Sequence, residues 1–126
     1  MNKLPPPALS TPAGIPLCSV DDIPDNGGKN FRLKVDDTRF CGFVLRRGDV
    51  IRGYVDRCPH AGGQLARKID NSVSPDGMFV SCSWHGAMFR LDDGVCVDGP
   101  CVGESLLPWP IVITDGQLIT AETGEE

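Results

Sequence analysis

Two short stretches decide the fold of this chain: "CPHAGG", which begins at Cys58, and "CSWHGAMF", which begins at Cys82. The chain of 126 residues has two histidines, His60 and His85, and each follows the first cysteine of one stretch at close range. Thiolate and imidazole are ligands that bind zinc and iron. Two histidines placed at random would seldom both follow a cysteine in this way, so the pattern predicts a metal site built from two loops.

Two kinds of metal site use two cysteines and two histidines. Zinc sites of this composition usually pair cysteine with cysteine and histidine with histidine along the chain. Each stretch of this chain carries one of each, which fits that arrangement poorly. A [2Fe–2S] cluster with mixed ligands takes two cysteines on one iron and two histidines on the other. Two loops that each supply one cysteine and one histidine would grip such a cluster from both sides.

Outside these stretches, the chain consists of short segments of alternating apolar and polar residues separated by turns. Phe31, Leu33 and Val35 alternate in this way, and Asp115-Gly116 is a strong hairpin signal. The expected strands lie within residues 30–35, 39–47, 49–57, 77–82, 86–91, 109–114 and 117–121. Only short helical turns are expected, near residues 20–23 and 64–69. We therefore predict an all-β fold of small antiparallel sheets, with both Cys/His stretches on loops.

The composition limits the kind of protein. The formal net charge is −5, and an acidic surface does not suit nucleic acid, whose phosphates require a basic one. No apolar run is long enough to span a membrane, and the Pro-rich residues 1–15 lack the apolar core of a secretory signal. We therefore expect a cytoplasmic protein without membrane contact, whose cysteines are ligands or thiols rather than disulfides. Four cysteines outside the ligand positions are expected to be small buried residues: Cys18, Cys41, Cys96 and Cys101.

The motif C-x-H followed by C-x-x-H-G resembles the signature of Rieske proteins. The resemblance implies one [2Fe–2S] cluster as cofactor, with Cys58 and Cys82 on one iron and His60 and His85 on the other. It extends over roughly residues 17–122. The fold it implies is an antiparallel three-sheet sandwich with a small cluster-binding subdomain.

The resemblance also implies a domain organisation. We expect a Pro-rich arm over residues 1–15 and a Rieske domain over residues 16–126, with the cluster-binding subdomain at about residues 56–92. Gly99-Pro100 resembles the third loop of the family, which covers the cluster. Residues 71–77 are expected to form an additional turn between the two ligand loops.

Residues beside the ligands indicate the type of Rieske protein. Respiratory-chain members have a disulfide between the two cluster loops, whereas the matching residues here are Gly63 and Trp84. Those members also carry a serine and a tyrosine after the second histidine, where this chain has Ala87 and Phe89. Hydroxyl groups that donate to the sulfurs stabilise the reduced cluster. Their absence therefore predicts a potential at the low end of the range of roughly −150 to +300 mV.

The resemblance makes the histidine-bound iron the point of electron exit. His60 and His85 would then lie near the surface. Their candidate neighbours are Trp84, Met88, Pro59 and Pro100, which form an apolar collar or are ordinary packing residues.

The sequence also bears on function. Both histidines are used, so none remains for the mononuclear iron of a terminal oxygenase, and no Gly-x-Gly-x-x-Gly motif indicates a nucleotide site. We therefore expect a non-enzymatic, soluble electron carrier of a ring-hydroxylating dioxygenase system. It would take one electron from a flavin-dependent reductase and pass it to a terminal oxygenase through transient contacts. The alternative is a small non-catalytic subunit of a larger reductase, of the nitrite reductase small-subunit type.

Overall fold

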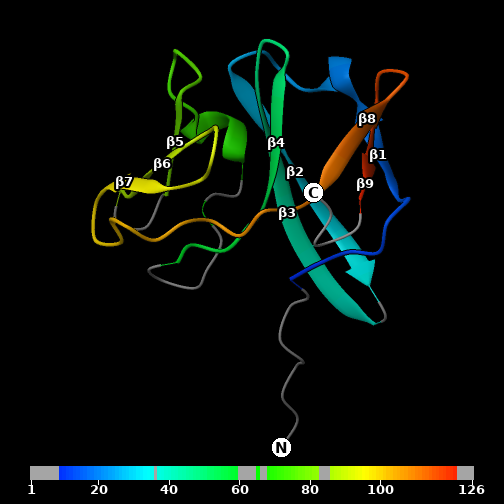
Figure 1. The fold of residues 1–126 in the computed structure, drawn as a ribbon, viewed down its shortest axis with the longest axis horizontal. Helices are drawn as coiled ribbons and strands as arrows, with labels where there is room; N and C mark the ends of the chain where they lie inside the picture. Colours follow the sequence, from blue (N-terminus) through cyan, green and yellow to red (C-terminus); the bar gives the residue numbers. More distant parts are fainter. Residues whose placement is uncertain (1–8, 36, 60–64, 66–67, 83–85, 122–126) are drawn as a thin grey trace, which may run out of the picture.

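The computed structural model describes residues 9–35, 37–59, 65, 68–82 and 86–121, and these form three antiparallel sheets (Figure 1). The first sheet contains β1 (Pro16–Ser19), β9 (Gln117–Thr120) and β8 (Ile111–Thr114), in that order. The middle sheet contains β2 (Gly27–Val35), β3 (Thr38–Arg47) and β4 (Val50–Val55). The third sheet contains β5 (Phe79–Ser81), β6 (Met88–Arg90) and β7 (Cys96–Asp98). The predicted all-β, three-sheet fold is confirmed.

The middle sheet is covered on both faces, and the central strand β3 shows why. Successive side chains of a strand point to opposite faces. Phe40 and Val44 therefore pack toward the first sheet, while Phe43 and Leu45 pack toward the third. Figure 1 shows the middle sheet standing between the other two. Two separate cores result, one on each side of β3.

The scaffold core lies between the first and middle sheets. Its buried members are Ile23, Phe40, Val44, Ile51, Val55, Trp109 and Leu118. The loop-side core lies between the middle sheet and the third sheet. Its buried members are Phe43, Leu45, Tyr54, Cys58, Leu65, Ile69, Val80, Cys82, Ala87, Phe89, Leu91, Cys96, Cys101 and Leu106.

Trp109 organises the scaffold core. Its ring centroid lies 4.9 Å from that of Phe40 and 5.8 Å from that of Phe31, so three aromatic rings pack together. The indole Nε1 donates to Oγ1 of Thr11 at 2.9 Å, which satisfies the buried polar group. A Cβ at Gly53 would lie 2.6 Å from the carbonyl oxygen of Trp109, so this close approach requires glycine.

Part of the expected N-terminal arm is bonded to β9. The amide of Gly14 donates to the carbonyl oxygen of Thr120 at 2.9 Å, and the amide of Ile15 donates to its Oγ1 at 2.8 Å. The same hydroxyl donates to the carbonyl oxygen of Pro12 at 2.7 Å. Residues 1–8 lie outside the described residues, so the division into an arm and a domain stays a prediction.

Two strands were not predicted, and one of the two helical turns extends beyond its expected residues. The strands β1 and β7 have four and three residues and show no clear alternation. The first helical turn is a 3-10 turn, η1 (Val20–Asp22), which Ser19 caps at the expected place. The second is η2 (Ile69–Ser72), which begins at the last of the expected residues 64–69; residues 64, 66 and 67 lie outside the described residues. No helix within the described residues is long and apolar enough to cross a membrane.

The predicted hairpin at Asp115-Gly116 is confirmed. Both residues have positive φ angles, 52° and 77°, and Thr114 pairs with Gln117 across the turn. This conformation suits the twist of the two strands that it joins. The hairpin joins β8 and β9 in the first sheet, which lies on the side of the middle sheet away from the ligand loops.

Candidate metal centre

The first ligand loop begins where β4 ends. The amide of Asp56 donates to the carbonyl oxygen of Cys41 at 3.0 Å, which keeps the chain attached to β3 beyond the strand. Cys58 follows two residues later and is only 1% exposed. The Oδ1 atom of Asp56 accepts from the amide of Leu65 at 2.8 Å. This bond joins the two ends of the first ligand loop.

Asp56 is an unusual residue for this position because it is a buried carboxylate. Burial raises the pKa of Asp56, while the hydrogen bond from Leu65 and the charge of Arg32 act in the opposite direction. Its Oδ2 atom has no hydrogen-bond partner among the described residues. Sequence reasoning missed this residue, because an aspartate after a strand is typical of an ordinary turn.

The second ligand loop lies between β5 and β6. The amide of Cys82 donates to the carbonyl oxygen of Ala87 at 2.8 Å, and the amide of Gly86 donates to that of Cys82 at 3.1 Å. These bonds close a tight loop, in which Gly86 has a φ of 70°. Cys82 is 2% exposed. Each ligand loop therefore places a cysteine in the loop-side core.

The third loop lies directly against the second. Gly99 has a φ of 101°, and a Cβ at this position would lie 2.7 Å from Cα of Ala87. The contact agrees with the expectation that Gly99-Pro100 belongs to a covering loop. The other two expected neighbours of the cluster that the structure describes are Pro59 and Met88, and both are half-buried.

Four of the six cysteines lie in the loop-side core: Cys58, Cys82, Cys96 and Cys101. Cys96 and Cys101 are each 1% exposed, which confirms that they are buried, whereas Cys18 and Cys41 are only half-buried. The Sγ of Cys101 donates to Sγ of Cys96, which in turn donates to the carbonyl oxygen of Asp98. Neither of them forms a disulfide in the structure.

The two histidines and two neighbouring residues lie outside the described residues: His60, His85, Gly63 and Trp84. Within the described part of the chain, no three metal-ligating side chains converge. Ala87 and Phe89, by contrast, are described and buried in the loop-side core. The structure thus brings Cys58 and Cys82 into one core, and the set of four ligands stays a prediction.

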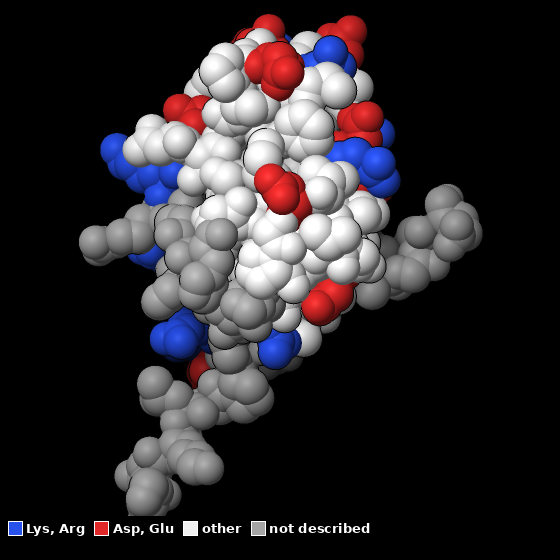
Figure 2. All heavy atoms as spheres, turned by 90° about the vertical axis from the view of Figure 1, so that its left-hand side faces the viewer, with Lys and Arg blue, Asp and Glu red and all other residues white. Residues whose placement is uncertain are grey.

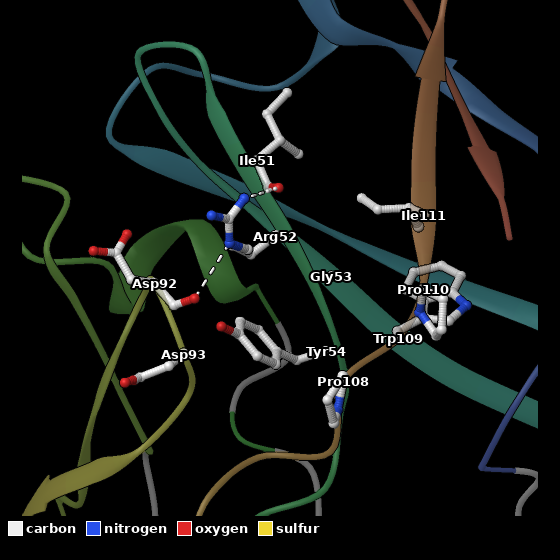
Figure 3. Close-up of a pocket in the computed structure, with 10 residues that line it drawn as sticks. All are labelled: Ile51, Arg52, Gly53, Tyr54, Asp92, Asp93, Pro108, Trp109, Pro110 and Ile111. Atoms are coloured by element: carbon white, nitrogen blue, oxygen red, sulfur yellow. Dashed lines mark hydrogen bonds between the residues drawn. The ribbon is translucent and has the colours of Figure 1, made fainter. Parts of the chain in front are cut away.

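A separate pocket lies at the junction of the middle and third sheets (Figure 3). It has a volume of about 290 Å³ and lies between β4, the turn at Asp92-Asp93 and residues 108–111. The Nε atom of Arg52 reaches across and donates to the carbonyl oxygen of Asp92 at 3.2 Å. Beside the pocket, the hydroxyl of Tyr54 donates to the carbonyl oxygen of Leu91 at 2.6 Å. None of the four predicted cluster ligands lines the pocket, and its hydrogen bonds join the middle sheet to the turn that follows β6.

The face that carries the third sheet has few charges at its centre. Figure 2 shows this face, on which scattered acidic and basic residues surround a largely uncharged surface. Several apolar residues in the segment from β7 onward are exposed, among them Val97, Val102 and Leu107. Val102 is the most exposed of these three, at 62%. Exposed apolar residues of this kind suit contact with another protein.

The donor chemistry fits an iron–sulfur cluster, because two loops each place a buried cysteine in the same core. The family comparison agrees with this assignment. The family model of the Rieske [2Fe-2S] domain matches residues 14–115, and this chain belongs to that family. The family binds one [2Fe–2S] cluster, so the resemblance that the sequence predicted is confirmed.

Individual relatives point in the same direction. The chain is 29% identical over 102 residues to the ferredoxin component of the p-cumate 2,3-dioxygenase system of Pseudomonas putida, covering 81% of this chain and 80% of that protein. It shares 20% identity and a TM-score of 0.64 with the ferredoxin of carbazole 1,9a-dioxygenase from Nocardioides aromaticivorans IC177, covering 86% of this chain and 99% of that one. The terminal oxygenase of carbazole 1,9a-dioxygenase from Novosphingobium sp. KA1 has a TM-score of 0.73 at 20% identity, covering 93% of this chain and 31% of that one. At these identities the solved structures establish the fold alone.

Proposed function

We propose that this chain is a one-electron carrier of a dioxygenase system, with Cys58, His60, Cys82 and His85 holding its [2Fe–2S] cluster. The observation that carries the proposal is the joint burial of Cys58 and Cys82 at two loops, in a chain of the Rieske family. The Pseudomonas putida relative is a ferredoxin component of such a system. When bound, the cluster accepts and returns one electron.

The described residues set the environment of that electron. Both cysteines are buried in an apolar core, which would keep water away from the sulfur atoms that hold the cluster. Ala87 and Phe89 follow the second loop and provide no hydroxyl to the sulfurs. Both factors disfavour the extra negative charge of the reduced state, which supports a potential at the low end of the Rieske range.

The partners in this proposal are a flavin-dependent reductase and a terminal oxygenase. The support for the oxygenase comes from related proteins, since a solved structure contains the oxygenase and ferredoxin of carbazole 1,9a-dioxygenase in complex. The exposed apolar side chains of Val97 and Val102 are the expected docking contacts, and the net charge of −5 is expected to steer the encounter. Such contacts are small and short-lived, and they suit a soluble cytoplasmic carrier.

The spectrum of the purified protein tests the cofactor and its ligands. The reduced protein is expected to show an electron paramagnetic resonance signal with an average g near ~1.9, the mark of mixed cysteine and histidine ligation. His60→Cys and His85→Cys are expected to move that average upward, toward an all-cysteine cluster. A colourless protein with one bound zinc would overturn the proposal.

Stopped-flow reduction and oxidation test the carrier role. The reduced protein, mixed with a terminal oxygenase of a dioxygenase system, is expected to be reoxidised in one phase, and more slowly at high salt because the encounter is steered by charge. Rates that do not change with salt would remove steering from the proposal. A cluster that no such reductase or oxygenase reduces or oxidises would remove the carrier role itself.

A further inference from the structure

Two thiols that the carrier role does not use lie beside each other under the third loop. The Sγ atoms of Cys96 and Cys101 are 3.1 Å apart, and each residue is 1% exposed. Both belong to the loop-side core, as do Cys58 and Cys82. A pair of free thiols at this separation is a candidate for covalent chemistry as well as for packing.

The backbone brings the two thiols together through a short hairpin. The amide of Cys96 donates to the carbonyl oxygen of Glu104 at 2.8 Å, and the amide of Glu104 donates to that of Cys101 at 2.9 Å. Between Cys96 and Glu104, the residues Gly99 and Gly103 have φ angles of 101° and 95°, which allow the chain to reverse within a few residues. The approach of the two sulfurs is therefore a product of the loop's own hydrogen bonds.

We propose that Cys96 and Cys101 form a reversible dithiol–disulfide couple in the third loop, with hydrogen peroxide as the oxidant. One sulfur attacks the peroxide O–O bond, becomes a sulfenic acid and releases water. The second sulfur then attacks the sulfenic sulfur, forms the S–S bond and releases a second water. The two thiols lose two electrons and two protons in total, and one peroxide becomes two waters. A small dithiol such as dithiothreitol reverses the step by exchange.

The burial of the pair determines which oxidant can act. Bulky disulfides such as oxidised glutathione need an exposed sulfur, whereas both sulfurs here are almost completely covered. Peroxide is small and uncharged, so it can reach them through fluctuations of the loop. Oxidation is expected to be slow, over hours rather than seconds, because buried thiols react slowly.

The couple acts on the part of the chain that covers the second ligand loop. Gly99 lies between the two cysteines and contacts Ala87, and Cys96 pairs with Phe89 across the third sheet. A disulfide between Cys96 and Cys101 would fix this short loop in its closed form. The oxidised protein is therefore expected to hold its cover over the second loop more rigidly than the reduced protein.

Peptide mapping after trypsin digestion tests the proposal, because trypsin separates Cys96 and Cys101 from the other four cysteines. No lysine or arginine follows Arg90, so the peptide of residues 91–126 contains Cys96 and Cys101 as its only cysteines. Each of the other four cysteines falls on a peptide of its own. The folded protein is incubated with peroxide, quenched with catalase, and denatured in N-ethylmaleimide before digestion. Peptide 91–126 is expected to lose two hydrogens and to take no label, and treatment with a reductant before labelling should restore both labels.

Two variants make the result decisive. Cys101→Ala is expected to abolish the unlabelled, lighter form of peptide 91–126, while the matched control Cys41→Ala retains it. Intact peptide 91–126 with two labels after prolonged exposure would overturn the proposal. A cross-link between the peptides of Cys58 and Cys82, with both labels still on peptide 91–126, would overturn it as well. The readout is covalent, so it does not depend on whether the protein carries electrons.

Discussion

The two sides of the middle sheet are built in different ways. On the scaffold side, the first sheet, whose strands have four residues each, packs on the long strands β2 and β3 of nine and ten residues, and the core follows from the alternation along β2 and β3. On the loop side, β5, β6 and β7 have three residues each. Strands this short contribute few ladder bonds, so that side relies on individual contacts such as Asp56 to Leu65 and on its cofactor. The fold therefore combines a scaffold specified by sequence pattern with a site that depends on few interactions.

Trp109→Ala breaks the scaffold side and has the largest expected effect. The side chain is 1% exposed and packs against Phe31 and Phe40, so its removal leaves a cavity and costs about 3–5 kcal/mol in the free energy of unfolding. Denaturant titration followed by circular dichroism measures the loss. Leu107→Ala, at a position that is 44% exposed, is the control. A change as small as that of the control would contradict the central role of Trp109.

Asp56→Ala breaks the loop side and has the next largest effect. It removes the acceptor at 2.8 Å from the Leu65 amide, which costs about 1–3 kcal/mol. We expect faster loss of iron on mild heating, measured by visible absorbance, with the circular dichroism of the scaffold retained. Asp56→Asn keeps an acceptor oxygen and is the matched control. Equal iron retention in the two variants would show that this hydrogen bond does not hold the first loop.

Tyr54→Phe tests the joint between the middle sheet and the third sheet, because its hydroxyl on β4 donates to the carbonyl oxygen of Leu91, directly after β6, within the loop-side core. Loss of this bond should cost about 1 kcal/mol near pH 7. Burial raises the pKa of Tyr54 to about 12, above the value near 10 of the unfolded chain. Its stabilising contribution is therefore complete below pH 10 and is lost as the pH rises toward 12.

The measurement is the free energy of unfolding of the wild type and Tyr54→Phe between pH 7 and pH 12. The gap between the two proteins should narrow as the pH rises through this range. A gap that stays constant would mean that the hydroxyl does not titrate with unfolding. Phe43→Leu, a substitution in the same core without a polar group, serves as the control for packing alone.

The contrast between the two sides also explains how much the sequence predicted. The alternation of Phe31, Leu33 and Val35 and the Asp115-Gly116 turn are local signals, and strand β2 and the hairpin of β8 and β9 follow from them. The C-x-H and C-x-x-H spacing singled out Cys58 and Cys82, and the structure buries both in one core. Burial of Asp56 depends on how the first ligand loop packs against the cores, which no local pattern encodes. The meeting of Cys96 with Cys101 depends on the hydrogen bonds of one short irregular loop, whose sequence shows no alternation to predict it.

Phe89→Tyr has the smallest expected effect of the four substitutions, because it changes one contact on the loop side and leaves the scaffold core intact. Phe89 is fully buried on β6, at the position where respiratory-chain Rieske proteins carry a tyrosine. A donor to a sulfur stabilises the reduced cluster, and a difference of about 1 kcal/mol corresponds to roughly 40 mV for one electron. We expect a rise in potential of this size in a spectroelectrochemical titration. Tyr54→Phe is the control, because its hydroxyl is bonded to Leu91 and its removal should leave the potential unchanged. If neither variant moves the potential, the low value must come from burial of the cysteines rather than from missing hydroxyl donors.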